Sequence, residues 1–457
     1  MELTTGEERG MTFKRTLLAA AVTGAVLATG TAHATNGYFS HGYGVKSMGM
    51  AGGGVAFAND NAMVIATNPA GITDVSSQAH GDLSWFKPVR GYDFRTDFSP
   101  MGGPVMSGSG DSDSENFFIP SLAFNYKMSE RDAVGLAIYG NGGMNTDYPA
   151  TDSNYLYSPM GGPGPESGPY GAGAAGVDLE QMFITPTYAR KFMGDKLSLG
   201  VSAVIARQKF SAKGLDAFDN PVYSTDPGYV TGNGHDSAWG FGGKVGVTFK
   251  PNEFITLGAS YQSKIDMDEF DDYSGLFAEG GDFDIPATWT VGLAAHVHDD
   301  VTLTFDYQRI NYEDVKAISN PSTSYLMDSM MGEPEKRLGG ENGAGFGWSD
   351  VDVLKLGVQW QATPKLQLRA GWNHGDNPIS SEDALFNTIA PGVVENHYTA
   401  GFSYAFNKNH ELHGAFMYAP EVEVHGDNPL FAAQGIDQQL TIRMKQYEAT
   451  VGYTYKF

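Results

Sequence analysis

Apolar and polar residues alternate along most of the chain from residue 80 to the C-terminus. In the last such segment, one face consists of Tyr447, Ala449, Val451, Tyr453, Tyr455 and Phe457. A period of two is that of a β-strand with one apolar face. The pattern predicts fourteen strands, at residues 80–95, 115–128, 131–141, 178–192, 196–211, 236–250, 253–266, 286–298, 300–312, 350–362, 364–375, 394–407, 409–421 and 443–457.

The connections between these segments alternate in length. Six are turns of one to three residues, and seven are long and polar, at about 96–114, 142–177, 212–235, 267–285, 313–349, 376–393 and 422–442. Short turns on one rim and long loops on the other are typical of a bacterial outer-membrane barrel. Lipid cannot hydrogen-bond an open sheet edge, so such a sheet must close. We therefore expect residues 80–457 to form an all-β, fourteen-stranded antiparallel transmembrane barrel. A soluble multi-sheet protein is the alternative, but it does not explain the alternating loop lengths.

The N-terminus has the layout of a secretory signal peptide. Lys14 and Arg15 precede an apolar run over 17–27, and the small-residue triplet 32–34 follows. We expect residues 1–34 to be removed after export, although a buried N-terminal helix is the alternative. Acidic residues before Met11 do not suit a basic leader, so Met11 is the expected start. The Gly-rich segment 35–79 suits a compact plug, or hatch, in the barrel mouth.

Composition excludes several other classes of protein. The chain has 457 residues, no Cys, 18 % charged residues and a net charge of −24. These values exclude a disulfide scaffold or Cys nucleophile and argue against nucleic-acid binding. The sequence has neither a Gly-x-Ser-x-Gly nor a His-Glu-x-x-His motif, so we expect no enzyme. The acidic clusters at 111–115 and 266–272 lack calcium-loop spacing. We therefore expect no metal or cofactor. We expect the acidic side chains of these clusters to be solvated on the loops, where they face lipopolysaccharide.

Several motifs resemble those of the FadL family of outer-membrane transporters for long-chain fatty acids and other hydrophobic compounds. They are the Gly-rich run 44–53, residues 59–62, Asn68-Pro69-Ala70-Gly71, the run 140–148 and the block 348–372. The resemblance implies an N-terminal hatch carrying the Asn-Pro-Ala motif, so Asn68, Pro69 and Ala70 are candidate gating residues. It also implies a monomer.

The same resemblance implies a kink in the third strand that opens the wall sideways beside the hatch. Gly140, Gly142 and Gly143 are the candidate kink residues, because glycine inside a strand indicates a bulge or bend. An ordinary loop start is the alternative interpretation of these glycines.

Apolar residues cluster near the predicted loop tips. They are Leu156, Leu276, Phe277, Leu326, Met327, Met330, Met331, Leu430 and Phe431. Exposed apolar clusters indicate binding of apolar partners, and Met adapts to varied ligand shapes. We interpret these residues as a capture site for a hydrophobic solute, with mutual packing of the loops as the alternative.

Three cations alternate with apolar residues and are therefore predicted to face the lumen: Lys244, Lys355 and Arg369. A carboxylate in a low-dielectric lumen would need such a partner. Internal salt bridges to Asp306 or Glu448 are the alternative.

Together these features predict passive uptake of hydrophobic solutes across the outer membrane of a Gram-negative bacterium. Each CH₂ moved from water to lipid gains roughly 0.8 kcal/mol, and the sequence carries no ATP-binding motif. Long-chain fatty acids are the expected cargo. The alternatives are an aromatic-hydrocarbon channel of the same type and a general porin.

Overall fold

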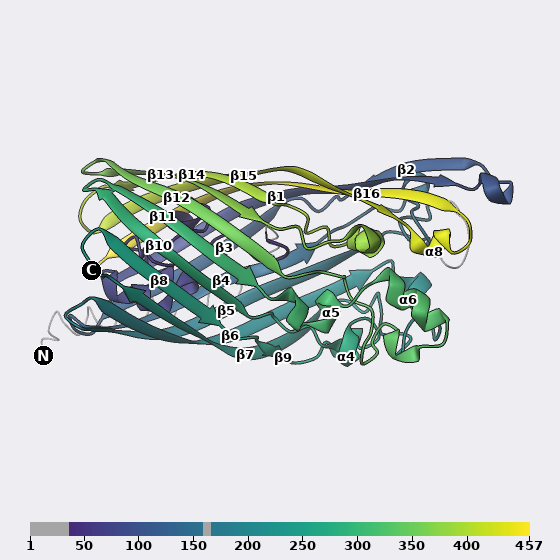
Figure 1. Cartoon of the computed structure of the whole chain (residues 1–457), viewed down its shortest axis with the longest axis horizontal. Coiled ribbons are helices and arrows are strands. Elements are labelled where there is room, and N and C mark those ends of the chain that lie inside the picture. The colour runs from purple at the N-terminus through teal and green to yellow at the C-terminus, as the bar shows by residue number, and fades with distance from the viewer. Residues whose placement is uncertain (1–35, 159–165) are drawn as a thin grey trace, which may run out of the picture.

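A computed structural model describes residues 36–158 and 166–457 of the chain, so the predicted signal peptide lies outside the described residues. Within those two ranges, an antiparallel sheet closes on itself because β1 pairs with both β3 and β16 (Figure 1). Fourteen strands form the barrel: β1 (Gln78–Asp97), β3 (Phe117–Lys127), β4 (Asp132–Asn145), β5 (Gly176–Phe192), β6 (Leu197–Lys213), β7 (Asp236–Phe249), β8 (Ile255–Gln262), β10 (Thr288–His298), β11 (Val301–Ile310), β12 (Val351–Thr363), β13 (Leu366–Gly375), β14 (Asn396–Ala405), β15 (His410–Asp427) and β16 (Asp437–Lys456). The predicted fourteen-stranded antiparallel barrel is confirmed.

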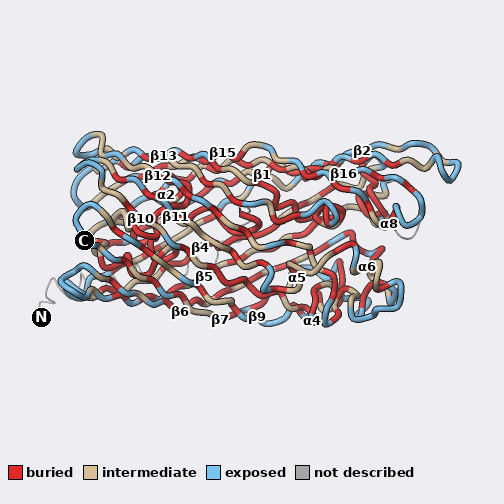
Figure 2. Tube along the Cα trace, in the orientation of Figure 1, coloured by how far each residue is buried: buried red, intermediate tan, exposed pale blue. Residues whose placement is uncertain are grey.

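The two faces of the wall differ as the alternation predicts. In β16, Val451 and Tyr453 are exposed on the outside, whereas Thr450 and Thr454 are buried in the interior. Figure 2 shows buried and exposed positions following one another along the strands. The outer surface is therefore apolar enough to face lipid, and the polar residues point into the lumen.

Several strands extend beyond their predicted ends at the loop rim. β15 continues to Asp427 and β16 begins at Asp437, so most of the predicted loop 422–442 is strand. The outward residues there are polar, such as Glu423 and Gln439. These parts of the strands have no apolar outer face, and the alternation used for prediction therefore ends before the strand does.

Two further strands lie outside the fourteen. β2 (Val105–Asp111) folds back on β1 and extends the first hairpin past the other loops (Figure 1). The short β9 (Asp266–Met267) pairs with β7 after β8 has ended at Gln262, earlier than predicted. β2 is rich in Gly and Ser, so its sequence carries no strand-like apolar pattern.

The long connections and the N-terminal segment contain short helices. The α-helices are α2 (Val45–Met48), α3 (Val64–Thr67), α4 (Ala278–Gly281), α5 (Lys316–Ser319), α6 (Thr323–Met330), α7 (Ala384–Asn387) and α8 (Pro429–Ala432). The 3₁₀ turns are η1 (Pro69–Asp74), η2 (Ser99–Met101), η3 (Asp152–Asn154), η4 (Asp216–Phe218), η5 (Asp271–Tyr273), η6 (Tyr312–Asp314), η7 (Pro334–Lys336) and η8 (Ser381–Asp383). None of the helices in the described ranges is long and apolar enough to span a membrane.

Residues 36–77, the N-terminal segment, lie inside the barrel. Polar side chains of the wall bond to its backbone: the ammonium of Lys355 donates to the carbonyl of His41 at 3.1 Å, and the amide of Ala51 donates to the hydroxyl of Thr399 at 2.9 Å. Figure 1 shows α2 and α3 in purple toward the end that carries the tight turns and the C-terminus. The wall thus supplies the hydrogen bonds that a compact segment without a sheet of its own requires.

Candidate functional site

The wall has one stretch where β3 and β4 run without pairing to each other. Their ladder begins in the turn and ends at the pair Leu122–Ile138. Beyond it, residues 117–121 of β3 still pair with β1, and residues 139–145 of β4 still pair with β5. We call the facing segments 117–121 and 139–145 the seam.

The two sides of the seam are joined again at its loop end, beyond residue 145 of β4. The amide of Asp113 donates to the carbonyl of Asp147 at 2.8 Å, and the amide of Asp147 donates to the hydroxyl of Ser112 at 3.0 Å. The seam is therefore bounded at both ends by hydrogen bonds between its two sides.

The N-terminal segment takes the place of β3 beside β4. The amide of Ser40 donates to the carbonyl of Asn141 and the amide of Gly143 donates to the carbonyl of Tyr38, each at 3.0 Å. A bulge lies at the same place, where the pairing with β5 shifts between Gly140 and Gly142. A Cβ on Gly142 would lie 2.0 Å from the Tyr38 carbonyl, so glycine allows this close approach. The predicted kink residues therefore all lie where β4 leaves β3 and contacts the N-terminal segment.

The Asn-Pro-Ala motif forms a corner that docks on the wall. Asn68 caps η1 by accepting from the amide of Ala70 at 3.0 Å, and Pro69 occupies the first position of that turn. The Asn68 amide donates to the carbonyl of Val247 in β7 at 3.0 Å. A Cβ on Gly246 would lie 2.0 Å from the Asn68 side-chain oxygen, so the corner fits only against glycine.

Ion pairs hold both parts of the N-terminal segment to the turn end of the barrel. Asp74, at the end of η1, bonds to Lys191 at 2.8 Å and to Lys250 at 2.6 Å. Burial alone would raise the pKa of Asp74, but these two hydrogen bonds outweigh burial and hold the pKa below its usual value. Lys46, in α2, lies 3.3 Å from Glu411, and burial lowers the pKa of Lys46 to about 8.

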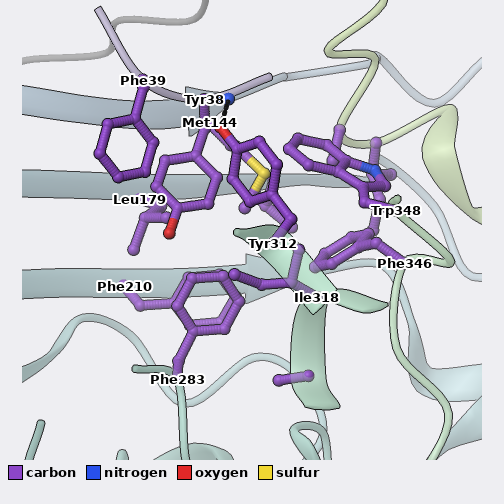
Figure 3. Close-up of a cluster of buried hydrophobic side chains, with 14 of the residues drawn as sticks. Tyr38, Phe39, Met144, Leu179, Phe210, Phe283, Tyr312, Ile318, Phe346 and Trp348 are labelled. Atoms are coloured by element: carbon purple, nitrogen blue, oxygen red, sulfur yellow. Dashed lines mark hydrogen bonds between the residues drawn. The ribbon is translucent and has the colours of Figure 1, made fainter. Parts of the chain in front are cut away.

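The first described residues reach an aromatic cluster beneath the loops. Figure 3 shows Tyr38, Phe39, Tyr312 and Trp348 gathered there. The hydroxyl of Tyr312 accepts from the amide of Tyr38 at 3.1 Å and donates to the carbonyl of Asn36 at 2.6 Å. The Tyr312 ring packs edge-on against Trp348, with 5.3 Å between ring centroids. The sequence analysis did not identify these aromatic residues, because the contact joins positions more than 270 residues apart.

A small apolar cavity lies under the loops beside this cluster. Three of the predicted capture residues line it: Leu276, Phe277 and Leu326. Phe210 and Phe218 are among its other lining residues. This part of the predicted capture site is therefore an internal cavity and not an exposed patch.

The other predicted capture residues lie elsewhere. Leu156, Leu430 and Phe431 are buried in contacts between loops, where the Phe431 ring packs on Tyr157 at 5.0 Å between centroids. Met330 and Met331 point into solvent at 54 % and 74 % exposure, and Met327 packs against the core. Loop packing, the alternative in the sequence analysis, describes the first three of these residues.

The three predicted lumen cations are all buried inside the barrel. Lys244 and Lys355 line one small polar cavity between the N-terminal segment and the wall strands β7–β12. Lys244 donates to the carbonyl of Ala66 at 2.5 Å, and Arg369 donates to the hydroxyl of Ser403 at 2.8 Å. Among the described residues, no carboxylate oxygen lies within 4.0 Å of any of these three cations.

The two acids named as alternative partners have other neighbours. Asp306 accepts from the amides of Gly54 and Val55 at 2.6 and 3.0 Å. Glu448 lies 3.7 Å from His41. In the described part of the chain, no group of three or more His, Asp or Glu residues is placed to hold a metal ion.

A closed barrel with an apolar outer face, a filled lumen and an apolar cavity under its loops defines an outer-membrane transport channel. Residues 25–457 match the family described as outer membrane protein transport protein (OMPP1/FadL/TodX), and the chain belongs to that family. It is 23 % identical to outer membrane protein P1 of Haemophilus influenzae, over 90 % of this chain and 91 % of the relative. It is 22 % identical to the 47 kDa outer membrane protein of Pasteurella multocida, over 97 % of this chain and 99 % of the relative.

Solved structures show the same fold. The toluene transporter TodX of Pseudomonas putida gives a TM-score of 0.62 at 17 % identity, covering 91 % of this chain and 99 % of that one. A FadL homologue of Pseudomonas aeruginosa gives 0.63 at 15 % identity, covering 92 % and 100 %. The protein is thus an outer-membrane transport protein of the OMPP1/FadL/TodX family, as the sequence motifs predict.

Proposed function

We propose that this channel takes up hydrophobic solutes passively and releases them sideways into the outer membrane. A solute enters the apolar cavity under the loops, passes the N-terminal segment acting as a hatch, and leaves through the seam between β3 and β4. The observation that carries this proposal is the pairing of β4 with Tyr38 and Ser40 in place of β3. Among the described residues, no strand pairs with residues 117–121 of β3 on the side facing β4.

The hydrophobic effect supplies the driving force for this route. Each CH₂ transferred from water to lipid gains roughly 0.8 kcal/mol, so a long acyl chain needs no other energy source. In this proposal Asn68, Pro69 and Ala70 anchor the hatch, and Gly140, Gly142 and Gly143 allow β4 to leave its neighbour. The barrel closes within one chain, which supports a monomer surrounded by outer-membrane lipid and lipopolysaccharide.

Long-chain fatty acids are the proposed cargo. Lys244 and Lys355 share one cavity and have no carboxylate within 4.0 Å among the described residues. A buried cation is costly without a counter-charge, and a fatty-acid carboxylate would supply one. Arg369 would contribute positive potential from the next strand.

Aromatic hydrocarbons are the second candidate. The cavity under the loops is lined almost entirely by apolar side chains, which suits a neutral ring. Two of the similar solved structures are described as toluene transporters, of Pseudomonas putida and Ralstonia pickettii. A general porin fits less well, because the N-terminal segment fills the lumen and bonds to the wall around it.

Uptake of labelled hexadecanoate and labelled toluene by cells expressing the channel tests the cargo. We expect the Lys244→Met/Lys355→Met double variant to take up hexadecanoate about tenfold more slowly, since charged hydrogen bonds contribute roughly 1.5–3 kcal/mol, and toluene at the wild-type rate. Lys408→Met, in an exposed turn, is the matched control. Equal hexadecanoate uptake by all variants would exclude a role for the two lysines.

A further inference from the structure

Arg90 spans the upper part of the seam from the inside. It lies on β1, faces the lumen and is 3 % exposed. One end of its guanidinium donates to the carbonyl of Asn145, at the end of β4. The other donates to the carbonyl of Ser114, three residues before β3 begins. A single buried cation thus contacts the polypeptide on both sides of the seam.

Arg90 also lines a small cavity beside Gly37 of the N-terminal segment. The other walls are mainly apolar and include Gly37, Met144, Trp348 and Met444. The Nε–H of Arg90 is buried and has no hydrogen-bond partner among the described residues. In the same part of the chain, no carboxylate oxygen lies within 4.0 Å of its guanidinium.

These observations are the features of an anion-binding site. The guanidinium contacts two carbonyls and lies over the ring of Phe117, 5.8 Å from its centroid. It still has an unused donor and no carboxylate beside it, which is unfavourable in an apolar surrounding. The Nε–H and a neighbouring Nη–H form a planar fork whose spacing matches the two oxygens of a carboxylate. The apolar walls fit the methylene groups next to such a head group.

We propose that the Arg90 cavity binds the carboxylate head of an amphiphilic solute immediately before it passes through the seam. The site is separate from Lys244, Lys355 and Arg369, none of which lines this cavity. It gives acids an interaction that a neutral hydrocarbon cannot make. This inference rests on the proposed function, because it requires solutes to reach the seam from the lumen.

Trp348 provides a direct readout, because it lines the same cavity. Bromine quenches tryptophan fluorescence on contact. We expect hexadecanoate brominated next to its carboxylate to quench the purified full-length protein in neutral detergent. Bromine at the methyl end should quench Trp348 much less. Trp348→Phe should remove the difference between the two probes. Equal quenching of wild-type Trp348 by both probes would overturn the proposed position of the head group.

Substitution of Arg90 separates charge recognition from folding. We expect Arg90→Gln to bind hexadecanoate about tenfold more weakly and hexadecanol with wild-type affinity, because only the acid uses the fork. Arg90→Lys keeps the charge without the fork, so its affinity for hexadecanoate should lie between those of wild type and Arg90→Gln. It also serves as the test if the Gln variant does not fold.

Two results for the variants would overturn the inference: unchanged affinity for hexadecanoate, or equal losses for the acid and the alcohol, which would make Arg90 only a structural bridge. A wild-type channel that takes up hydrophobic solutes but fails these tests refutes the Arg90 site alone. A wild-type channel that takes up neither hexadecanoate nor toluene refutes the proposed function itself.

Discussion

The backbone amide of Gly143 donates a hydrogen bond to the carbonyl of Tyr38 at 3.0 Å, which joins wall strand β4 to the N-terminal segment inside the barrel. The same segment of β4 has no contact of this kind with β3. The ring and backbone of Tyr38 are in turn held by Tyr312 from the loop end. One short piece of chain therefore connects the loop region, the lumen and the seam.

The fit between the Asn-Pro-Ala corner and the wall predicts a large effect of one methyl group. Gly246→Ala would place a Cβ 2.0 Å from the Asn68 side-chain oxygen, so the corner must move away from β7. We expect a stability loss of roughly 1–3 kcal/mol, as for other overpacked sites, and a raised ion conductance in planar bilayers. Gly243→Ala, three residues along the same strand, is the control, because its Cβ would meet only a carbonyl at 3.9 Å. Wild-type conductance in both variants would count against the docking of the hatch.

The cavity under the loops predicts that Leu326 and Met331, which are neighbours in the sequence, differ in their effect on the binding of an apolar probe. Leu326→Asn would leave an amide without partners in an apolar cavity, at a cost of roughly 1–3 kcal/mol. We expect about tenfold weaker binding of an apolar fluorescent probe by the purified protein. Met331→Asn should bind the probe normally, since Met331 is 74 % exposed and does not line the cavity. If the two variants behaved alike, the cavity would not be the capture site.

The Asp74 anchor predicts a specific dependence on pH. Its pKa is lowered in the folded protein, so the ion pairs with Lys191 and Lys250 stabilise the fold above the ordinary carboxyl pKa of about 4 and are lost as pH falls through the lower folded value. We expect Asp74→Asn to lower the free energy of unfolding by roughly 1–2 kcal/mol at pH 7. The difference from wild type should persist at pH 5 and vanish in stronger acid. If the difference in free energy of unfolding between wild type and Asp74→Asn did not shrink in strong acid, Asp74 would stabilise the fold without its charge.

The sequence predicts the barrel well because lipid forces an apolar residue to every second position. Tyr453 and Val451 face lipid in β16, and the alternation there marks the strand. The same signal is absent where β15 and β16 leave the membrane, since residues such as Glu423 face water. Strand identity was therefore predictable, whereas strand length was not.

The site was predictable only where a short motif carries it. The glycines of β4 and the Asn-Pro-Ala corner were identified from motifs. The structure places the glycines against the N-terminal segment and the corner against β7, and their roles in transport stay predictions. Arg90 was missed because its importance depends on the carbonyls of Ser114 and Asn145, which the fold brings together. Periodicity cannot indicate which buried cation lacks a carboxylate partner.

The most direct test of the lateral route is to lock the seam. The chain has no Cys, so a cleavable cross-linker can join Pro120→Cys to Gly140→Cys across it. Leu122→Cys with Ile138→Cys, the last paired position below the seam, is the matched control. We predict that cross-linking the first pair abolishes uptake of labelled hydrophobic solute and that cleavage restores it, while the control pair transports normally. Undiminished uptake through a fully cross-linked seam would contradict the account.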